Sequence, residues 1–257
     1  MWRTIKSYIF NGLAHYNVRN RIEYIRLLLR VSDVPIVKQR LAKRVNYIYT
    51  YVISINSHFE RRQFMSSQLD SQKINFVFVD ATVGKNIGEY YNFISDKSLK
   101  YLTEGSVGCW ISHLRVWQMV ARGENGYYII LEDDVNLFEN FLQNIKCSLT
   151  KVSNDFDILF LGTGNNYKHN RRFIINNEIF VPYQLRNGAY SYILTPNGAR
   201  KLIELIPNVK VARGGIDSAI GALIRDCKIL AYHLIIPVCQ VDYSFGSFTK
   251  SRKNGIL

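Results

Sequence analysis

Short blocks of apolar and aromatic residues, separated by polar turns, recur along most of the chain and predict strands. The expected strands cover residues 47–55, 75–79, 127–131, 157–162, 189–194 and 229–238, with a hairpin at 174–182. Apolar residues at helical spacing predict helices at residues 59–69, 107–122, 196–205 and 216–225. Because strands and helices alternate, we expect an α/β domain over residues 47–257, with a mainly parallel sheet and helices on both faces.

The most informative stretch is residues 127–134, which read Tyr-Tyr-Ile-Ile-Leu-Glu-Asp-Asp. A buried strand cannot hold three adjacent charges, so the strand must end where the acids begin. In an extended segment alternate residues point the same way, so Glu132 and Asp134 share one face and Asp133 takes the other. Two carboxylates on one face suit a hard divalent cation that also holds substrate phosphates. The alternative is a solvated acidic turn that binds nothing.

Composition places the chain among globular proteins, since 47% of its residues are hydrophobic and its mean hydropathy is −0.07. Its four cysteines lack metal-binding spacing, which indicates reduced thiols and a cytoplasmic protein. No apolar run is long enough to span a bilayer, and no signal peptide opens the chain. We therefore expect no membrane-spanning helix, no zinc site at the cysteines and no disulfide framework.

The net charge of +13 is concentrated at the start of the chain. Residues 1–46 hold ten Lys or Arg against two acids, a net of +8, while the remaining 23 basic and 18 acidic residues give +5. No nucleic-acid-binding motif accompanies this charge, so we do not expect a nucleic-acid partner. With Trp2, Ile5, Ile9 and Leu13, the segment instead suits a helical extension on an anionic membrane surface. The alternative is a helical arm packed on the body or on a second copy.

A predicted helix holds a second group of polar residues with two interpretations. Trp110, Leu114 and Trp117 fall at i, i+4 and i+7 and form a packing face. His113 lies beside that face, so spacing alone favours a hydrogen-bonded core histidine over a ligand-binding one. Ser112 could be a polar residue of the helix face with no role in binding.

Taken together, these segments resemble glycosyltransferase family 25, the lipooligosaccharide galactosyltransferase-like family. The resemblance covers roughly residues 47–250, and its blocks occur in the family's order at residues 52–56, 60–62, 78–81, 102–114, 131–135 and 189–199. The helix block reads Gly108-Cys109 and then Ser112-His113-Leu114, and the acidic block is Leu-Glu-Asp-Asp-Val. One departure is Ser106, which stands where the family usually has a Glu. Residues 1–46 have no counterpart in the family.

The resemblance implies a GT-A-like, Rossmann-type fold that binds a nucleotide sugar at the carboxyl edge of its sheet. Glu132 and Asp134 would hold the metal, with Mn²⁺ implied by the family and Mg²⁺ equally compatible with oxygen ligands. The other residues that we assign to donor binding lie at strand ends or in the matching blocks; they are Asn56, Arg61, Asp80, Ser112, His113 and Asp133. Polar residues at strand ends are also common in loops that only turn the chain.

An inverting transfer needs a general base that removes the proton of the acceptor hydroxyl. We assign this role to Asp217, which follows Gly214 and Gly215 at the expected start of a helix. The alternative is that Asp217 caps the helix, since Asp is favoured at that position.

The reaction that the resemblance implies is transfer of a hexose, most simply galactose from UDP-galactose, to a lipooligosaccharide sugar. A glucosyl- or N-acetylhexosaminyltransferase on the same scaffold is the nearest alternative. A metal-dependent phosphodiesterase or nuclease would also use acids and basic charge, but the five histidines are scattered along the chain. A binding module without catalytic activity is a third alternative, against which the intact acidic motif argues.

Overall fold

A computed structural model describes residues 47–84, 88–123, 125–152, 156–162, 172–174, 176–182 and 188–246. The expected extension at residues 1–46, with its proposed membrane contact, lies outside the described residues, as do residues 163–171 and those after Gly246. None of the helices in the described ranges is long and apolar enough to cross a membrane.

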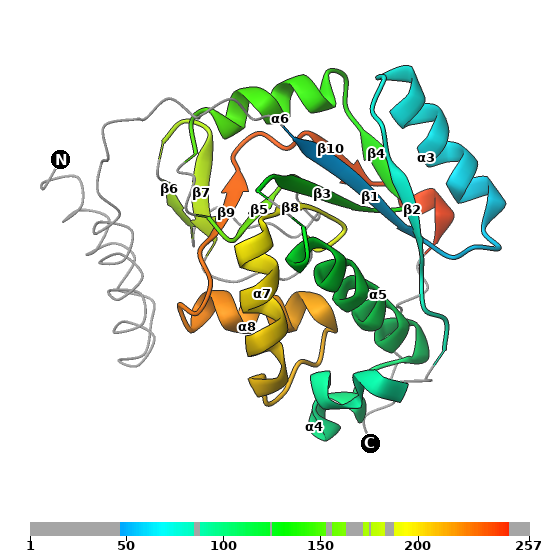
Figure 1. Ribbon diagram of the computed structural model, residues 1–257, viewed down its shortest axis with the longest axis vertical. Coiled ribbons are helices and arrows are strands. Elements are labelled where there is room, and N and C mark those ends of the chain that lie inside the picture. Colours follow the sequence, from blue (N-terminus) through cyan, green and yellow to red (C-terminus); the bar gives the residue numbers. More distant parts are fainter. Residues whose placement is uncertain are drawn as a thin grey trace, which may run out of the picture.

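The described strands form one large mixed sheet and one small sheet (Figure 1). The large sheet has the order β2-β1-β3-β8-β5-β9-β7-β6. Its strands are β1 (Ile48–Ser54), β2 (Val77–Asp80), β3 (Tyr127–Glu132), β5 (Ile158–Phe160), β6 (Arg172–Ile174), β7 (Ile179–Pro182), β8 (Ser191–Leu194) and β9 (Ala231–Leu234). The pairs β2-β1, β1-β3 and β5-β9 are parallel and the other four are antiparallel, so only β8 and β7 run against the rest. The mainly parallel direction expected from the sequence is confirmed.

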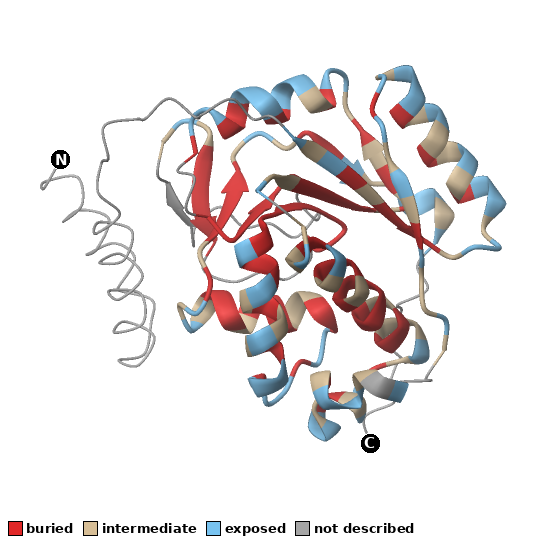
Figure 2. Cartoon of the chain, in the orientation of Figure 1, coloured by how far each residue is buried: buried red, intermediate tan, exposed pale blue. Residues whose placement is uncertain are grey.

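Helices cover both faces of the sheet and bury it from two sides. They are α5 (Glu104–Ala121), α7 (Pro196–Leu205) and α8 (Ile216–Arg225) on one face, and α3 (Phe59–Ser71) and α6 (Phe141–Leu149) on the other. Along β3, Tyr128 and Ile130 face the first group, whereas Ile129 and Leu131 face the second. The central strands are consequently buried almost throughout (Figure 2). The expected α/β class with helices on both faces is confirmed.

Two local expectations need correction. The strand expected at residues 229–238 is shorter, because β9 ends at Leu234 and the chain turns before β10 (Cys239–Val241). The acidic motif is followed directly by a further strand, β4 (Val135–Leu137), which pairs antiparallel with β10 in the small sheet. The helix α6 and the short helical segments η1 (Gly88–Phe93), α4 (Asp96–Leu99), η3 (Ile206–Asn208) and η4 (Tyr243–Phe245) were also not predicted.

A close backbone contact fixes the position of α5 against the end of β2. Gly108 in α5 lies so near the carbonyl oxygen of Thr82 that a Cβ atom would overlap it. The hydroxyl of Ser112 donates to the Gly108 carbonyl at 2.6 Å and accepts the Thr82 N–H at 2.8 Å. Ser112 is fully buried, and both of its hydrogen bonds join backbone groups. Its observed contacts therefore position helix α5. The next residue, His113, is thereby held at the carboxyl edge of the sheet.

Candidate active site

The carboxyl ends of β1, β2 and β3 meet at one edge of the large sheet, because β1 pairs in parallel with both neighbours. The last residue of β3 is Glu132, and Asp133 and Asp134 form the turn into β4. The acidic motif is therefore presented at the edge where open α/β sheets bind their ligands. Its three carboxylates have three different environments.

Asp133 points into the protein and forms an internal ion pair. Its Oδ1 accepts a hydrogen bond from Arg61 Nη1 at 2.8 Å, and its Oδ2 accepts one from the Ser54 hydroxyl at 2.7 Å. The side chains of Arg61 and Asp133 are only 9% and 8% exposed. Buried charges are stable only when they are paired and hydrogen-bonded, so this pair fixes the turn at the end of β3.

Arg61 also ties this turn to the C-terminal part of the described chain. Its Nη2 donates to the carbonyl oxygens of Phe245 and Gly246 at 3.1 and 3.0 Å. The guanidinium carbon lies 5.4 Å from the centre of the Phe245 ring, a cation–π distance. These contacts give Arg61 a structural function, and its assignment to a donor diphosphate stays a prediction.

Asp134 carries a carboxylate whose charge is only partly compensated. Its Oδ2 lies 3.4 Å from Arg61 Nη1, while its Oδ1 is buried and has no hydrogen-bond partner among the described residues. Burial, followed by the nearby Glu132 carboxylate, raises the pKa of Asp134 to about 7, although Arg61 opposes the shift. An unpartnered buried oxygen beside other carboxylates fits a divalent cation with oxygen ligands such as Mn²⁺ or Mg²⁺.

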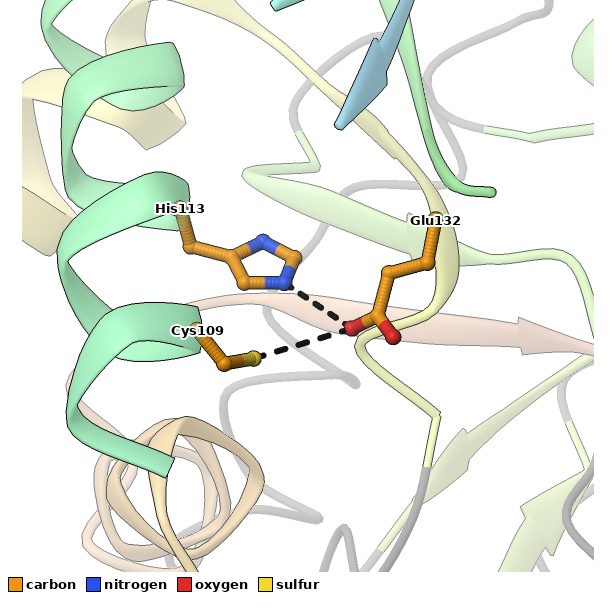
Figure 3. A group of neighbouring side chains, drawn as sticks. All are labelled: Cys109, His113 and Glu132. Carbon is orange, nitrogen blue, oxygen red and sulfur yellow. Dashed lines mark hydrogen bonds and ion pairs between the residues drawn. The ribbon is translucent and has the colours of Figure 1, made fainter. Parts of the chain in front are cut away.

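Glu132 is oriented by hydrogen-bonded side chains that begin in the core. Trp117 Nε1 donates to the hydroxyl of Tyr192 at 2.7 Å, and that hydroxyl lies 2.9 Å from His113 Nδ1. The other ring nitrogen, His113 Nε2, lies 3.2 Å from Glu132 Oε1 (Figure 3). Since Trp117, Tyr192 and His113 are fully buried, they form a rigid support for the carboxylate of Glu132.

Cys109 approaches the same carboxylate one helical turn before His113. Its Sγ lies 3.8 Å from Glu132 Oε1 (Figure 3). Burial, followed by the negative charge of Glu132, raises the pKa of the Cys109 thiol well above its usual range. Of the residues that the structure describes, Cys109, His113 and Glu132 form the one set of three potential metal ligands whose ligand atoms lie close together.

Asp217 lies in the first turn of α8 and contacts a different loop. Its Oδ1 accepts the backbone N–H groups of Gly188 and Ala189 at 2.9 and 2.8 Å. The N-terminal cap of α8 is Gly215, with φ of 75°, so Asp217 does not cap its own helix. Burial is the main cause that raises the pKa of Asp217 to about 6, the two backbone bonds oppose it, and the Glu132 charge adds to it. Asp217 is therefore held by the loop before β8, and its role as general base stays a prediction.

Asn56 and Asp80 lie at the sheet edge but contribute differently. Asn56 is an exposed residue of the turn after β1. The carboxylate of Asp80 forms an ion pair with Arg62, and its carbonyl oxygen accepts a hydrogen bond from Arg115 Nη1 at 3.0 Å. These positions are compatible with donor binding, and the roles assigned to both residues stay predictions.

Two tyrosines near Glu132 were not identified from the sequence. The hydroxyl of Tyr190 is buried without a hydrogen-bond partner among the described residues and lies, with the Cys239 carbonyl, beside Gly162. Burial is the main cause that raises its pKa. Tyr192 supports His113 from the next strand. The strand pattern of residues 189–194 predicted their place in the sheet but could not show which side chains meet the acidic motif.

Comparison with known proteins identifies the family of proteins that share this region of the chain. A family model described as "Glycosyltransferase family 25 (LPS biosynthesis protein)" matches residues 47–217. A "Putative glycosyltransferase" of Haemophilus influenzae is 28% identical over 208 residues, covering 76% of this chain and 71% of that protein. "Procollagen galactosyltransferase 1-A" of Xenopus laevis is 24% identical over 71% of this chain and 32% of its own length. "Procollagen galactosyltransferase 2" of Homo sapiens is 23% identical over 80% of this chain and 34% of its own length.

The matched region includes the acidic motif, the helix that carries His113, and Asp217. The match spans about a third of the length of the two procollagen galactosyltransferases. A glycosyltransferase moves a sugar from an activated donor to an acceptor hydroxyl, which agrees with an acidic site at the carboxyl edge of an α/β sheet. The chain belongs to glycosyltransferase family 25 and is a glycosyltransferase.

Proposed function

We propose that the protein transfers a hexose, most simply galactose from UDP-galactose, to a sugar hydroxyl of a lipooligosaccharide. The galactosyl donor is supported by the similarity to procollagen galactosyltransferases, and the acceptor by the family's description as an LPS biosynthesis protein. The observation that carries the proposal is the buried oxygen of Asp134, which has no hydrogen-bond partner among the described residues and lies beside Glu132 at the carboxyl edge of the sheet.

Glu132 and Asp134 would hold the divalent cation, Mn²⁺ or Mg²⁺. When bound, this cation would neutralise charge on the diphosphate leaving group. The protein's own contribution is to present the two carboxylates in fixed positions. The ion pair of Asp133 with Arg61 fixes the turn, and His113 orients Glu132.

Asp217 is proposed as the general base. Its pKa of about 6 leaves it largely ionised at neutral pH and near the value that proton transfer at that pH favours. Both backbone N–H bonds go to Oδ1, so Oδ2 can take the proton of the acceptor hydroxyl. The acceptor oxygen then bonds to the anomeric carbon as the bond from that carbon to the diphosphate oxygen breaks. UDP leaves, and the configuration at the anomeric carbon is inverted.

The remaining donor contacts are assigned to the sheet edge. Asn56, Arg61 and Asp80 would contact the uridine or its diphosphate, since they lie at or just after the ends of β1 and β2. The same scaffold could take UDP-glucose or a UDP-N-acetylhexosamine. Family membership argues against the phosphodiesterase and nuclease alternatives.

Residues 1–46 are proposed to attach the protein to the cytoplasmic face of the inner membrane, where a lipid-linked acceptor would be concentrated. Their net charge of +8 supports this assignment, since each basic residue near an anionic surface contributes about 1 kcal/mol. Co-sedimentation with anionic liposomes tests it. Binding that is weakened by salt and lost on deletion of residues 1–46 is expected, and equal binding after the deletion contradicts the assignment.

A panel of UDP-sugars tests the proposed donor. Purified protein is incubated with each donor and a lipooligosaccharide acceptor, with Mn²⁺ or with EDTA. Preferred turnover of UDP-galactose that requires the cation is expected. Preference for another UDP-sugar would replace galactose but keep the transferase, whereas turnover that is equal in EDTA would contradict the metal assignment.

A further inference from the structure

Three potential ligands of a softer metal ion converge from two elements beside the acidic motif. Cys109 and His113 are four residues apart on α5, so both side chains leave the same side of the helix. Glu132 faces them from the end of β3 (Figure 3). Their ligand atoms all lie within 4.8 Å of one another.

Two of the three separations between these atoms are close to those of a tetrahedral zinc site, and the third is below 4.8 Å. Zinc bond lengths of about 2.0 Å to oxygen and nitrogen and about 2.3 Å to sulfur imply separations of about 3.3 Å for N···O and about 3.5 Å for S···O. The observed distances are 3.2 Å from His113 Nε2 to Glu132 Oε1 and 3.8 Å from Cys109 Sγ to the same oxygen. A zinc ion therefore needs only shifts of a few tenths of an ångström in these two distances.

The surroundings also match those of a bound zinc ion. A histidine ligand normally uses its second ring nitrogen for a hydrogen bond that fixes the ring, and His113 Nδ1 lies 2.9 Å from the Tyr192 hydroxyl. His113 is fully buried, but Cys109 and Glu132 are partly exposed, so an ion has a route from solvent. Cysteine sulfur, histidine nitrogen and glutamate oxygen are all ligand types that zinc uses in proteins, and catalytic zinc sites have three protein ligands.

The local charge favours a cation at the same place. Asp134 follows Glu132 by two residues in the same acidic motif. Neighbouring carboxylates create a negative potential that stabilises a positive ion. Binding of the ion would release the thiol proton to solvent.

We propose that Cys109, His113 and Glu132 form a binding site for Zn²⁺ that is separate from the Mn²⁺ or Mg²⁺ site but shares Glu132 with it. When Zn²⁺ is bound there, Glu132 is no longer available to bind Mn²⁺ or Mg²⁺ together with Asp134, and sugar transfer is inhibited. This inhibition rests on the proposed function, whereas binding of the metal does not. The order of metal affinities favours Zn²⁺ over Mn²⁺ at nitrogen and sulfur ligands.

Cobalt titration tests the site without any enzyme assay. Co²⁺ added to the metal-free full-length protein should give a thiolate-to-cobalt charge-transfer band in the near ultraviolet, and added Zn²⁺ should remove it. Cys109→Ser and Cys109→Ala should lose the band, while Cys147→Ser, at an exposed position on α6, should keep it. Absence of the band in the unchanged protein, or its persistence in both Cys109 variants, overturns the site. Thermal melting establishes that each variant is folded.

The shared use of Glu132 is tested by inhibition. With Mn²⁺ at saturation, Zn²⁺ should inhibit transfer, and Cys109→Ser should need at least about tenfold more Zn²⁺ for the same inhibition. Cys147→Ser serves as the matched control. Equal sensitivity of Cys109→Ser and the unchanged protein overturns the sharing of Glu132. A protein that gives the cobalt band but transfers no sugar from any donor contradicts the proposed function and leaves the zinc site supported.

Discussion

Arg61 Nη1 lies 2.8 Å from Asp133 Oδ1 but 3.4 Å from Asp134 Oδ2, so one guanidinium separates two adjacent carboxylates into different roles. Asp133 forms a buried ion pair with Arg61, while Asp134 has a buried oxygen without a hydrogen-bond partner among the described residues. The acidic motif thus divides into one residue that supports the turn and two that can bind a cation.

The first prediction follows from this division. Asp133→Ala leaves the buried Arg61 guanidinium without its closest carboxylate, and loss of one partner of a buried pair costs about 3–5 kcal/mol. We expect a large fall in the free energy of unfolding, measured with denaturant in EDTA. Asp70→Ala, at an exposed position on α3, is the control and should change stability little. A loss below about 1 kcal/mol for Asp133→Ala contradicts the structural role.

The second prediction concerns Asp217 and pH. Its pKa is raised from 3.8 to about 6, so the folded protein holds this proton over a pH range in which the unfolded chain has lost it. Its contribution to stability is therefore largest below pH 3.8 and is lost as the pH rises to about 6. For a partly exposed group we expect a loss of about 1–3 kcal/mol.

Asp217→Asn keeps the Oδ1 acceptor but cannot titrate, which separates the two functions of this residue. Denaturant unfolding in EDTA should show the unchanged protein losing stability relative to the variant between pH 4 and pH 7. Transfer by the variant should fall by about 10²–10⁴-fold in kcat, with donor binding retained. Parallel stability profiles for the two proteins contradict the raised pKa, and near-normal kcat contradicts the role as base.

The third prediction concerns the support of Glu132. Tyr192→Phe removes the hydroxyl that joins Trp117 Nε1 to His113 Nδ1 and leaves both ring groups without this partner. We expect a stability loss of about 1–3 kcal/mol and, since such supporting bonds orient metal ligands, about tenfold weaker Mn²⁺ activation. Tyr91→Phe removes an exposed hydroxyl bond to Asp96 and is the control. Unchanged Mn²⁺ activation in Tyr192→Phe contradicts the support.

Much of the fold was predictable because its signals are local. The strand Tyr127–Glu132 has apolar residues on both faces and ends on the first of three acids, one residue after the end expected from hydration alone. Helix α8 was predicted with the observed bounds. By contrast, α6 was missed although Phe141, Ile145 and Leu149 recur at helical spacing, and its start at Asn140 with φ of 57° has no side-chain cap.

The acidic residues of the site could be predicted from the sequence, but the side chains that contact them could be predicted less well. Adjacent charges at a strand end are visible in the sequence, but the pairing of Asp133 with Arg61 joins residues 72 positions apart. Tyr192 meets His113, and Cys109 meets Glu132, only because β8 lies beside β3 and α5 packs across them. Periodicity shows that such residues are buried but cannot show which polar groups they face.

The fourth prediction tests the close contact beneath the helix. Gly108→Ala places a methyl group against the Thr82 carbonyl. Because that carbonyl belongs to the backbone, it cannot move aside without a cost in free energy. We expect a stability loss of about 1–3 kcal/mol and reduced activity, because α5 carries His113. Gly84→Ala is the control, because φ at Gly84 is 85° but no atom lies within 4 Å of the added methyl group. This variant shows the effect of backbone strain without steric overlap. Unchanged unfolding of Gly108→Ala shows that α5 is not held by this contact.

The most direct measurement for the whole account is the Mn²⁺ dependence of sugar transfer from UDP-galactose by Asp134→Ala. We expect transfer and Mn²⁺-dependent UDP binding to be lost. The melting temperature in EDTA should stay equal or rise, because a buried charge that Arg61 compensates only in part is removed. Asp70→Ala should keep full activity. Near-normal turnover of Asp134→Ala at the same Mn²⁺ concentration would contradict the assignment of the acidic motif as the metal site.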